Sequence, residues 1–317
     1  MIAVAAILAF VVGFALQRGR ICAVLAVREG VIEGRWSRFL SLLECASWAM
    51  IGLLLADALG AKPLSAWTWS SSLPLAMIGG ALFGIGALIN GSCAFGSATR
   101  LASGELAIIA VIAGFLVGFS SAQHLGWTAP SSVAAPHLSV HLMSAIAVAL
   151  SAFALWRGFA VVRVLAERAS IAAIFIQPRW PPALAMFIVG AANVALVLVA
   201  ANWSYLSVLG DALTGSGALT AVRWLIVALF FAGAVSGALT AGRFRWRGAS
   251  VSEIVTRIGA GVVMGLGAAL IPGGNDALIV FGMPLLQPAA FAAYGTMVGV
   301  IAVAFLVGER FRSAQGA

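Results

Sequence analysis

Charged residues are scarce in this chain. They make up 9% of its 317 residues, whereas 62% are hydrophobic, and soluble domains carry roughly 25% charged residues. The mean hydropathy of +1.09 excludes an ordinary soluble protein. Apolar stretches of about 17 to 25 residues, long enough to cross a roughly 30 Å hydrocarbon core, recur about nine times. We therefore predict an all-α integral membrane protein with about nine crossings, forming a single transmembrane domain over residues 1–317.

Cysteine is also scarce, since only Cys22, Cys45 and Cys93 occur. The sequence contains no C-x-x-C pair and no Cys/His cluster at the spacing of zinc ligands. These absences argue against a disulfide framework and predict neither a metal site nor a cofactor. They also weaken the case for a thiol enzyme, because no histidine neighbours a cysteine in the sequence and no resolving thiol is paired with one.

Acidic residues are fewer than basic ones, 10 against 18, and the formal net charge is +8. The arginines fall in short connections between apolar runs, so membrane topology explains them better than nucleic-acid binding does. By the positive-inside rule, the basic connections at 18–38, 157–179 and 243–257 are cytoplasmic. The N-terminus is then outside, the C-terminus is cytoplasmic, and the connection around Asp211 lies outside. The first apolar run, Ile2 to Leu16, lacks the flanks of a signal peptide and is interpreted as a retained helix.

Glycine, in contrast, is abundant, and it interrupts two of the apolar runs. The run at 75–103 contains a stretch that predicts two half-helices meeting at Asn90 to Cys93, and the run at 258–283 is broken within Ile271-Pro-Gly-Gly-Asn-Asp276. Each glycine inside a helix costs roughly 1 kcal/mol relative to alanine. A bilayer tolerates broken backbone only where protein covers it or where it lines a polar cavity. Both breaks are therefore candidate sites.

The glycines also indicate a duplication. A shift of 181 residues superimposes seven of them on glycines of the second half, where chance would give roughly two. We predict repeat one at 1–136 and repeat two at 181–317, separated by a linking helix and an inner-surface segment at 137–180. Each half has four crossings, and the extra helix inverts the second half, giving a 4+1+4 inverted repeat. In that architecture the site lies near the midplane, where the broken helices meet. The seven pairs are 34/215, 52/233, 80/261, 84/265, 86/267, 114/295 and 118/299.

The candidate substrate path follows from the breaks. A thiol is a polarizable, weak donor that can contact an anion without burying a charge of its own. Half-helix N-termini add backbone N–H groups and positive dipole ends. Cys45 lies outside any break and is predicted to be an inert buried thiol. The predicted path residues are Cys22, Asn90, Gly91, Ser92, Cys93, Arg100, Gly273, Gly274, Asn275 and Asp276.

Two of these residues have an equally simple structural interpretation. Asp276 is an ionisable group at membrane depth, which favours a functional role, but it could equally cap the half-helix that follows it. Arg100 could attract or release an anion at the inner mouth, or it could only mark the cytoplasmic side by snorkelling to the interface. The sequence leaves both alternatives open.

Three stretches resemble the signatures of the YeeE/YedE sulfur-transport membrane proteins. They are Gly13-Phe-Ala-Leu-Gln-Arg-Gly-Arg-Ile-Cys22, Asn90-Gly-Ser-Cys-Ala-Phe-Gly96 and Pro272-Gly-Gly-Asn-Asp-Ala-Leu-Ile-Val-Phe-Gly-Met-Pro284. The resemblance covers nearly the whole chain. It implies a bacterial inner-membrane protein that takes up thiosulfate or a related sulfur compound, often beside a small TusA-like sulfurtransferase. Cys22 and Cys93 match two of the family's relay cysteines, whereas Gly274 stands where a third is expected.

The expected function is therefore inward transport of a small sulfur-containing anion, with thiosulfate as the best guess, by a protein that is not an enzyme. The departure at Gly274 leaves related species such as sulfite or a selenium compound as alternatives. Another alternative is a membrane thiol oxidoreductase or sulfurtransferase, and a third is a partner-binding subunit without a path of its own. The small-residue faces permit a homodimer, and the sequence does not identify the energy coupling.

Overall fold

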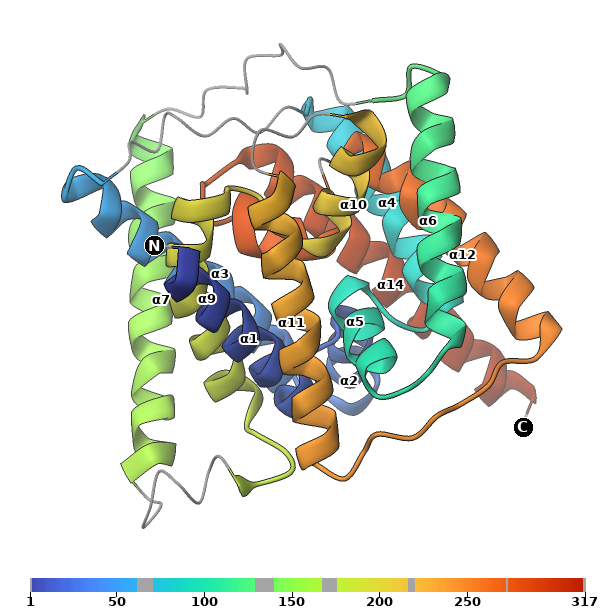
Figure 1. Cartoon of the computed structure of the whole chain (residues 1–317), viewed down its shortest axis with the longest axis horizontal. Helices are drawn as coiled ribbons and strands as arrows, with labels where there is room; N and C mark the ends of the chain where they lie inside the picture. Colours follow the sequence, from blue (N-terminus) through green and yellow to red (C-terminus); the bar gives the residue numbers. More distant parts are fainter. Residues whose placement is uncertain are drawn as a thin grey trace.

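The computed structural model describes residues 2–61, 71–128, 140–166, 176–215, 220–271 and 273–315, and these are nearly all helical. Within them the only β-structure is an isolated bridge between Glu105 and Arg247. Nine stretches of the described chain are long and apolar enough to cross a membrane. The prediction of an all-α protein with about nine crossings is confirmed (Figure 1).

The helices follow one another in the order that the apolar runs predicted. The part of the chain before the linking helix contains α1 (Ile2–Gly19), α2 (Ala23–Glu33), α3 (Ser37–Ala58), α4 (Leu73–Asn90), α5 (Ala94–Ala102) and α6 (Ala107–His124). The linking helix is α7 (Val140–Ala166). The remainder contains α9 (Pro182–Ala200), α10 (Tyr205–Thr214), α11 (Thr220–Thr240), α12 (Val251–Leu270), α13 (Asn275–Ala277), the π-helical turn η2 (Leu278–Gly282) and α14 (Pro288–Gln315).

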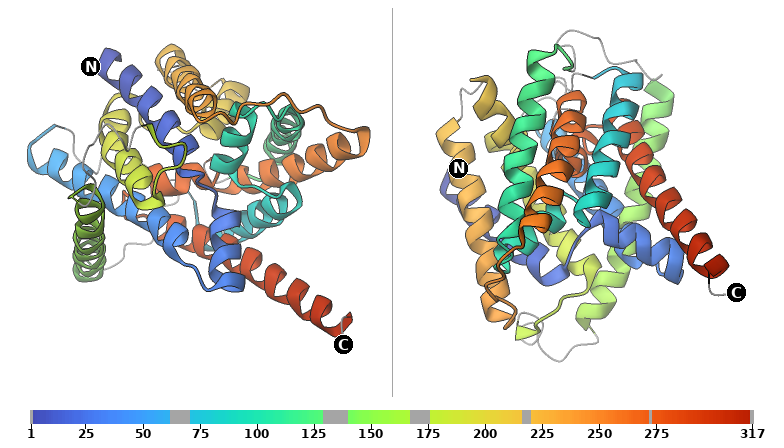
Figure 2. Two further views of the ribbon diagram at one scale, coloured as in Figure 1. Left: turned by 90° about the horizontal axis from the view of Figure 1, so that it is seen from below. Right: turned by 90° about the vertical axis from the view of Figure 1, so that its right-hand side faces the viewer.

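The long helices form two groups with the short helices between them. In one group α4 and α6 pack against α12, and α14 packs against α4. In the other, α1 packs against α9 and α11, and α3 packs against α9. The short helices α2, α5 and α10 each contact both groups, and α13 contacts α10 and α5. The two groups and the short helices between them are visible in Figures 1 and 2. The interrupted segments thus lie in the middle of the molecule.

The element bounds keep the spacing that the glycines indicated. Adding 181 to the bounds of α1 gives 183–200, and α9 spans Pro182–Ala200. Adding 181 to the bounds of α5 gives 275–283, and α13 with η2 covers 275–282. The element order therefore supports a duplication. The inversion of one half relative to the other and the repeat boundaries stay predictions.

Two connections proved to be helical. The basic stretch 18–38 contains α2, whose buried residues Ala23, Val24, Ala26 and Val27 form an apolar stripe at helical spacing. The stretch around Asp211 contains α10, which begins at the capping residue Ser204. A search for membrane-length apolar runs misses these helices because both apolar stripes are short and because arginines interrupt the first stretch. The inner-surface segment is predicted at 160–176, within the linker 137–180. Residues 160–166 of it continue α7, and 167–175 lie outside the described residues.

Close helix packing explains one of the two repeated Gly-x-x-x-Gly pairs and not the other. A Cβ at Gly114 or Gly118 would lie 2.1 Å from a backbone carbonyl of α12, so these glycines let α6 and α12 touch. The corresponding pair, Gly295 and Gly299, has no heavy atom of the described chain within 4 Å of an added Cβ. A Gly-x-x-x-Gly spacing predicts close helix packing for both pairs. Within the described chain this prediction is wrong for the α14 pair, because that face of α14 is exposed.

Candidate functional site

Both candidate cysteines stand at the start of a short helix. Cys22 is the N-cap of α2 and Cys93 is the N-cap of α5, each with an extended backbone. The preceding helices end in residues with a left-handed backbone, Arg20 at φ 52° and Gly91 at φ 71°. Glycine adopts this conformation without cost, whereas it strains a residue with a side chain. The chain therefore reverses sharply before each thiol, and the predicted break at Asn90 to Cys93 is present.

The two thiols lie against one another. Their side chains are within hydrogen-bond contact, and the backbone N–H of Ala23 donates to Cys93 Sγ at 3.1 Å. Cys93 is fully buried, whereas Cys22 is 8% exposed. The Cys93 thiol is thus enclosed by protein, whereas the Cys22 thiol reaches an accessible space. The helix starts that carry them supply backbone N–H groups at the same place, which favours partial negative charge.

The second break is fastened directly to the first. Asn275 Oδ1 accepts a hydrogen bond from the backbone N–H of Ala94 at 2.9 Å, and the Tyr205 hydroxyl donates to the Ala94 carbonyl at 3.0 Å. The first N–H group of α5 is therefore already occupied by Asn275. The N-terminus of α5 therefore has one fewer free N–H group to offer an anion than the sequence led us to expect.

Gly274 stands where the resemblance leads one to expect a cysteine, and its surroundings leave little space. A Cβ at Gly274 would lie 2.4 Å from Leu206 Cδ1 and 2.7 Å from Asp276 Oδ1. A Cβ at Gly273 would lie 2.2 Å from Ser207 Oγ, and its backbone has φ +106°. A side chain at either position would require its neighbours to move. Both residues belong to a tightly packed turn.

Asp276 is almost fully buried, at 1% exposure. Its carboxylate faces Ser204 and the backbone N–H groups of Leu206 and Ala277. Among the described residues none of these groups forms a hydrogen bond of ordinary geometry with it. Asp276 lies in the first turn of α13, but the N-cap of this helix is Gly274 and no side chain caps it, so the capping alternative is not supported. The carboxylate is left incompletely satisfied.

Asn90 and Arg100 form polar contacts around the first break. Asn90 Nδ2 donates to the Ser92 carbonyl at 2.8 Å and to the hydroxyls of Ser92 and Ser97 at 2.9 Å. Arg100 binds both oxygens of Glu105, with its Nε donating at 2.7 Å. Burial would raise the pKa of Glu105, but the bond from Arg100 and the charges of Arg100, Arg257 and Arg247 lower it overall. Arg100 therefore has an acidic partner already.

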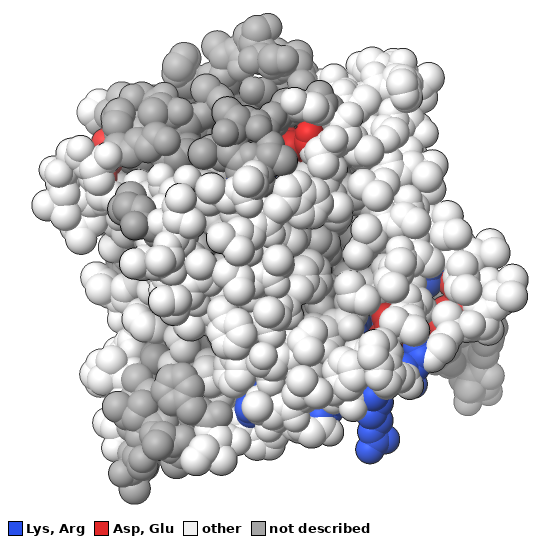
Figure 3. Space-filling model, in the orientation of Figure 1, with Lys and Arg blue, Asp and Glu red and all other residues white. Residues whose placement is uncertain are grey.

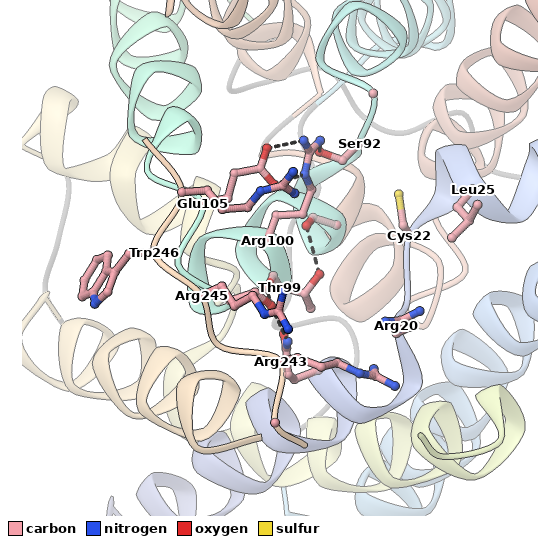
Figure 4. A pocket seen from close by; sticks show the side chains of 16 residues that line it. Arg20, Cys22, Leu25, Ser92, Thr99, Arg100, Glu105, Arg243, Arg245 and Trp246 are labelled. Carbon is pink, nitrogen blue, oxygen red and sulfur yellow. Dashed lines mark hydrogen bonds and ion pairs between the residues drawn. The ribbon is translucent and has the colours of Figure 1, made fainter. Parts of the chain in front are cut away.

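A cavity of about 840 Å³ lies beside Cys22 (Figure 4). Of the predicted path residues, Cys22, Gly91, Ser92 and Arg100 line it, whereas the others do not. Sequence reasoning missed the arginines of the segment between α11 and α12, because their position after an apolar run is also what membrane topology produces. The full lining is Gln17, Arg20, Cys22, Leu25, Gly91, Ser92, Gly96, Thr99, Arg100, Ser103, Glu105, Gly242, Arg243, Arg245, Trp246 and Arg247.

The charge distribution over the surface matches this arrangement. On the face drawn in Figure 3, the basic side chains gather along the lower edge and the middle carries no charge. Among the described residues, no group of three or more His, Cys, Asp or Glu side chains could hold a metal ion. The arrangement of buried thiols leading to a cationic cavity suits contact with an anion.

In the described part of the chain, nine apolar spans accompany an interrupted-helix core with two touching thiols, and this arrangement is that of a multi-pass membrane protein. The chain belongs to the family described as Sulphur transport, the YeeE/YedE family, whose pattern matches residues 18–303. It is also similar to the thiosulfate transporter TsuA of Escherichia coli (strain K12). The two are 25% identical over 294 residues, which cover 82% of this chain and 81% of the relative.

Proposed function

We propose that this protein carries a small sulfur-containing anion, with thiosulfate as the best candidate, past Cys93 and then Cys22 into the arginine-lined cavity. The observation that carries the proposal is the pair of touching thiols at two helix starts. Family membership supports the transport of sulfur compounds, and TsuA is named as a thiosulfate transporter. The best-supported class is thus a transporter rather than an enzyme.

The path uses thiols because sulfur is soft and polarizable. An S–H group can donate weakly to an anion and can release it, whereas a buried cation would hold it at a large desolvation cost. The missing thiol at Gly274 is replaced in this proposal by backbone groups of the turn at Gly273 and Gly274, close to Asn275 and Asp276. Sulfite or a selenium compound remains the alternative cargo.

The setting of the proposal is a bacterial inner membrane, with lipid around the apolar helices. The positive-inside rule places the arginine-lined cavity on the cytoplasmic side, the N-terminus outside and the C-terminus inside. A TusA-like sulfurtransferase would receive the sulfur compound at the cavity mouth. A homodimer is compatible with the exposed glycine pair on α14. No part of the proposal involves a nucleic acid or a cofactor.

The experiment is uptake of labelled thiosulfate into vesicles that carry the wild type, Cys93→Ala, Cys22→Ala or Cys45→Ala. Cys45 is fully buried in α3, belongs to neither break in the sequence and does not line the cavity, so it serves as a matched control. We expect saturable uptake that falls at least about tenfold in the first two variants and stays unchanged in the third. Sulfite, selenite and sulfate are added as competitors to test the alternative cargoes.

Uptake that is equal in all four proteins would rule out the thiol path. If the wild type takes up no thiosulfate but one of the competitors enters and depends on Cys93, the path stands and the assignment of thiosulfate is wrong. Mixed disulfides or persulfides accumulating on Cys22 during turnover, with no net uptake, would instead favour the sulfurtransferase alternative.

A further inference from the structure

Two arginines of the cavity lack a counter-charge. Among the described residues, no carboxylate pairs with Arg20 or Arg243, and the buried Nη1 of Arg243 has no hydrogen-bond partner. Other arginines of this region have acceptors: Arg18 donates to Thr240 Oγ1 at 2.8 Å, and Arg100 binds Glu105. Arg245 and Arg247 of the same cavity also form no ion pair among the described residues. Arg20 and Arg243 differ from them in the buried, unpartnered Nη1 of Arg243 and in the closeness of the charge of Arg20 to Arg243.

The two guanidinium groups approach each other although they carry the same charge. Figure 4 shows Arg243 extending toward Arg20, with Cys22 above them. Burial and the nearby charges of Arg20, Arg179 and Arg18 lower the pKa of Arg243. Like charges that converge in a partly buried space raise the free energy of the empty site, and a bound anion would remove that cost.

The backbone conformation at Arg20 fixes where this side chain starts. Arg20 has a positive φ of 52°, which is uncommon for a residue with a side chain and concentrates at functional sites. Arg243 follows the end of α11, where the chain turns at Gly242 with φ 64°. Both arginines stand on segments that direct them into the same cavity from the ends of two packed helices, α1 and α11.

We propose that Arg20 and Arg243 form a binding site for a divalent oxyanion beside Cys22, at the inner end of the path. Two planar guanidinium groups present several N–H donors to the oxygens of such an anion. Arg100 does not belong to this site because Glu105 already binds it. The site deepens the proposed function, since it would receive the anion from Cys22 and hold it before release, but binding at this site does not require transport.

The site is tested through the reactivity of Cys22, the one cysteine that lines the cavity; Cys45 and Cys93 are fully buried. Purified protein in detergent is treated with two methanethiosulfonate reagents of similar size, one carrying a sulfonate and one a quaternary ammonium group. We expect the anionic reagent to modify Cys22 about tenfold faster at low salt, because the arginines concentrate anions at the thiol. Mass spectrometry identifies the modified residue.

The variants are Arg20→Gln, Arg243→Gln and Arg243→Lys, with Arg28→Gln as the matched control. Arg28 lies on α2, is exposed and does not line the cavity. The rate ratio should fall about threefold or more in either glutamine variant, fall less in the lysine variant, and stay unchanged in the control. Thiosulfate, sulfate and phosphate are added separately, and a divalent oxyanion that occupies the site should slow modification in the wild type only.

An unchanged ratio in both glutamine variants, each shown to be monodisperse and thermally stable, would overturn the proposed site. So would equal protection of Cys22 by the oxyanions in the wild type and in Arg243→Gln. If wild-type vesicles take up neither thiosulfate nor any of the competing anions, but the charge bias and the protection both depend on Arg243, the transport proposal fails and the oxyanion site stands. The comparison of sulfate and phosphate with thiosulfate shows whether the site selects the transported anion or accepts any divalent oxyanion.

Discussion

At the scale of single residues, Gly96 controls the space around the accessible thiol. A Cβ at Gly96 would lie 2.7 Å from Cys22 Sγ and 3.0 Å from Ser92 Cβ. The Cys22 side chain is short and sits at the start of α2, so it has little room to yield. We expect Gly96→Ala to fold at a cost of about 1–3 kcal/mol and to reduce thiosulfate uptake strongly by displacing the thiol.

The control for this substitution is Gly259→Ala on α12, where an added Cβ meets no heavy atom within 4 Å. The measurement is the initial rate of uptake, normalised to protein that elutes as a single species. Wild-type uptake by Gly96→Ala would show that the exact position of the Cys22 thiol does not matter for transport.

Asn275 gives a second prediction at this scale, on stability. Its Oδ1 satisfies the buried backbone N–H of Ala94. In Asn275→Ala that donor loses its partner, and leaving a buried donor unsatisfied costs about 1–3 kcal/mol. Tyr205→Phe removes only the hydroxyl that donates to the Ala94 carbonyl, so we expect a smaller loss of about 0.5–1.5 kcal/mol. Thermal unfolding in detergent measures both losses of stability. A larger loss in Tyr205→Phe than in Asn275→Ala would contradict this account of the contacts at Ala94.

At the scale of elements, Glu105 links three segments of the chain. It lies between α5 and α6 and accepts from Arg100 of α5 and, at 3.4 Å, from Arg257 of α12. Its lowered pKa means that the folded state favours the ionised carboxylate. Glu105 therefore contributes stability above the ordinary glutamate pKa of about 4.3, and this contribution disappears as the pH falls through the lower folded-state value.

We accordingly expect Glu105→Gln to be less thermally stable than the wild type at neutral pH. The difference between the two proteins should be constant above about pH 5 and should shrink at lower pH. Melting temperatures of both proteins, measured across this pH range, show whether the difference in stability shrinks or grows as the pH falls. A difference that grows as the pH falls would mean that Glu105 is protonated in the folded protein.

The two glycine pairs at the same repeat positions give a matched test of helix packing. Gly114 of α6 faces the Ile258 carbonyl of α12, whereas Gly295 of α14 faces open space. Gly114→Leu should force the two helices apart and cost about 1–3 kcal/mol or more. Gly295→Leu should stay within about 0.5 kcal/mol of the wild type. Equal losses in the two variants, measured by thermal unfolding of the monomer, would mean that the α14 face is covered in the folded protein.

The same elements show what the sequence could and could not reveal. The helix break at Asn90 to Cys93 was predictable because glycine and polar residues interrupt an apolar run, and composition reports such an interruption directly. The helices α2 and α10 were not, because they are shorter than a membrane span and begin in stretches that look like connections. The difference between Gly114 and Gly295 depends on which helix lies opposite, and a repeated motif does not contain that information.

The cavity was beyond sequence reasoning for a related reason. Arg100 and Arg243 both follow apolar segments, so topology accounts for each equally well. Only the fold shows that Glu105 binds Arg100 and that no carboxylate of the described chain binds Arg243. The distinction between a structural arginine and one available to a ligand lies in its tertiary partner.

At the scale of the whole molecule, the orientation in the membrane decides what the cavity does. Trp246 lines the cavity and is 73% exposed, whereas Trp127 follows α6 and is 58% exposed. Trp246 precedes Arg247, which bridges to Glu105 just before α6, whereas Trp127 follows the other end of α6. Because α6 spans the molecule (Figure 1), the two tryptophans lie near its opposite ends. In a background without the three native cysteines, Trp127→Cys and Trp246→Cys therefore report the two faces of the membrane.

We expect a membrane-impermeant maleimide to label Trp127→Cys in cells with a permeabilised outer membrane, and to label Trp246→Cys only after the inner membrane is disrupted. The reason is the positive-inside rule, which places the arginines around Trp246 in the cytoplasm. Labelling in the opposite order would turn the cavity outward. Arg20 and Arg243 would then meet the anion before the thiols do, and the order of contacts along the proposed path would be Cys22 followed by Cys93.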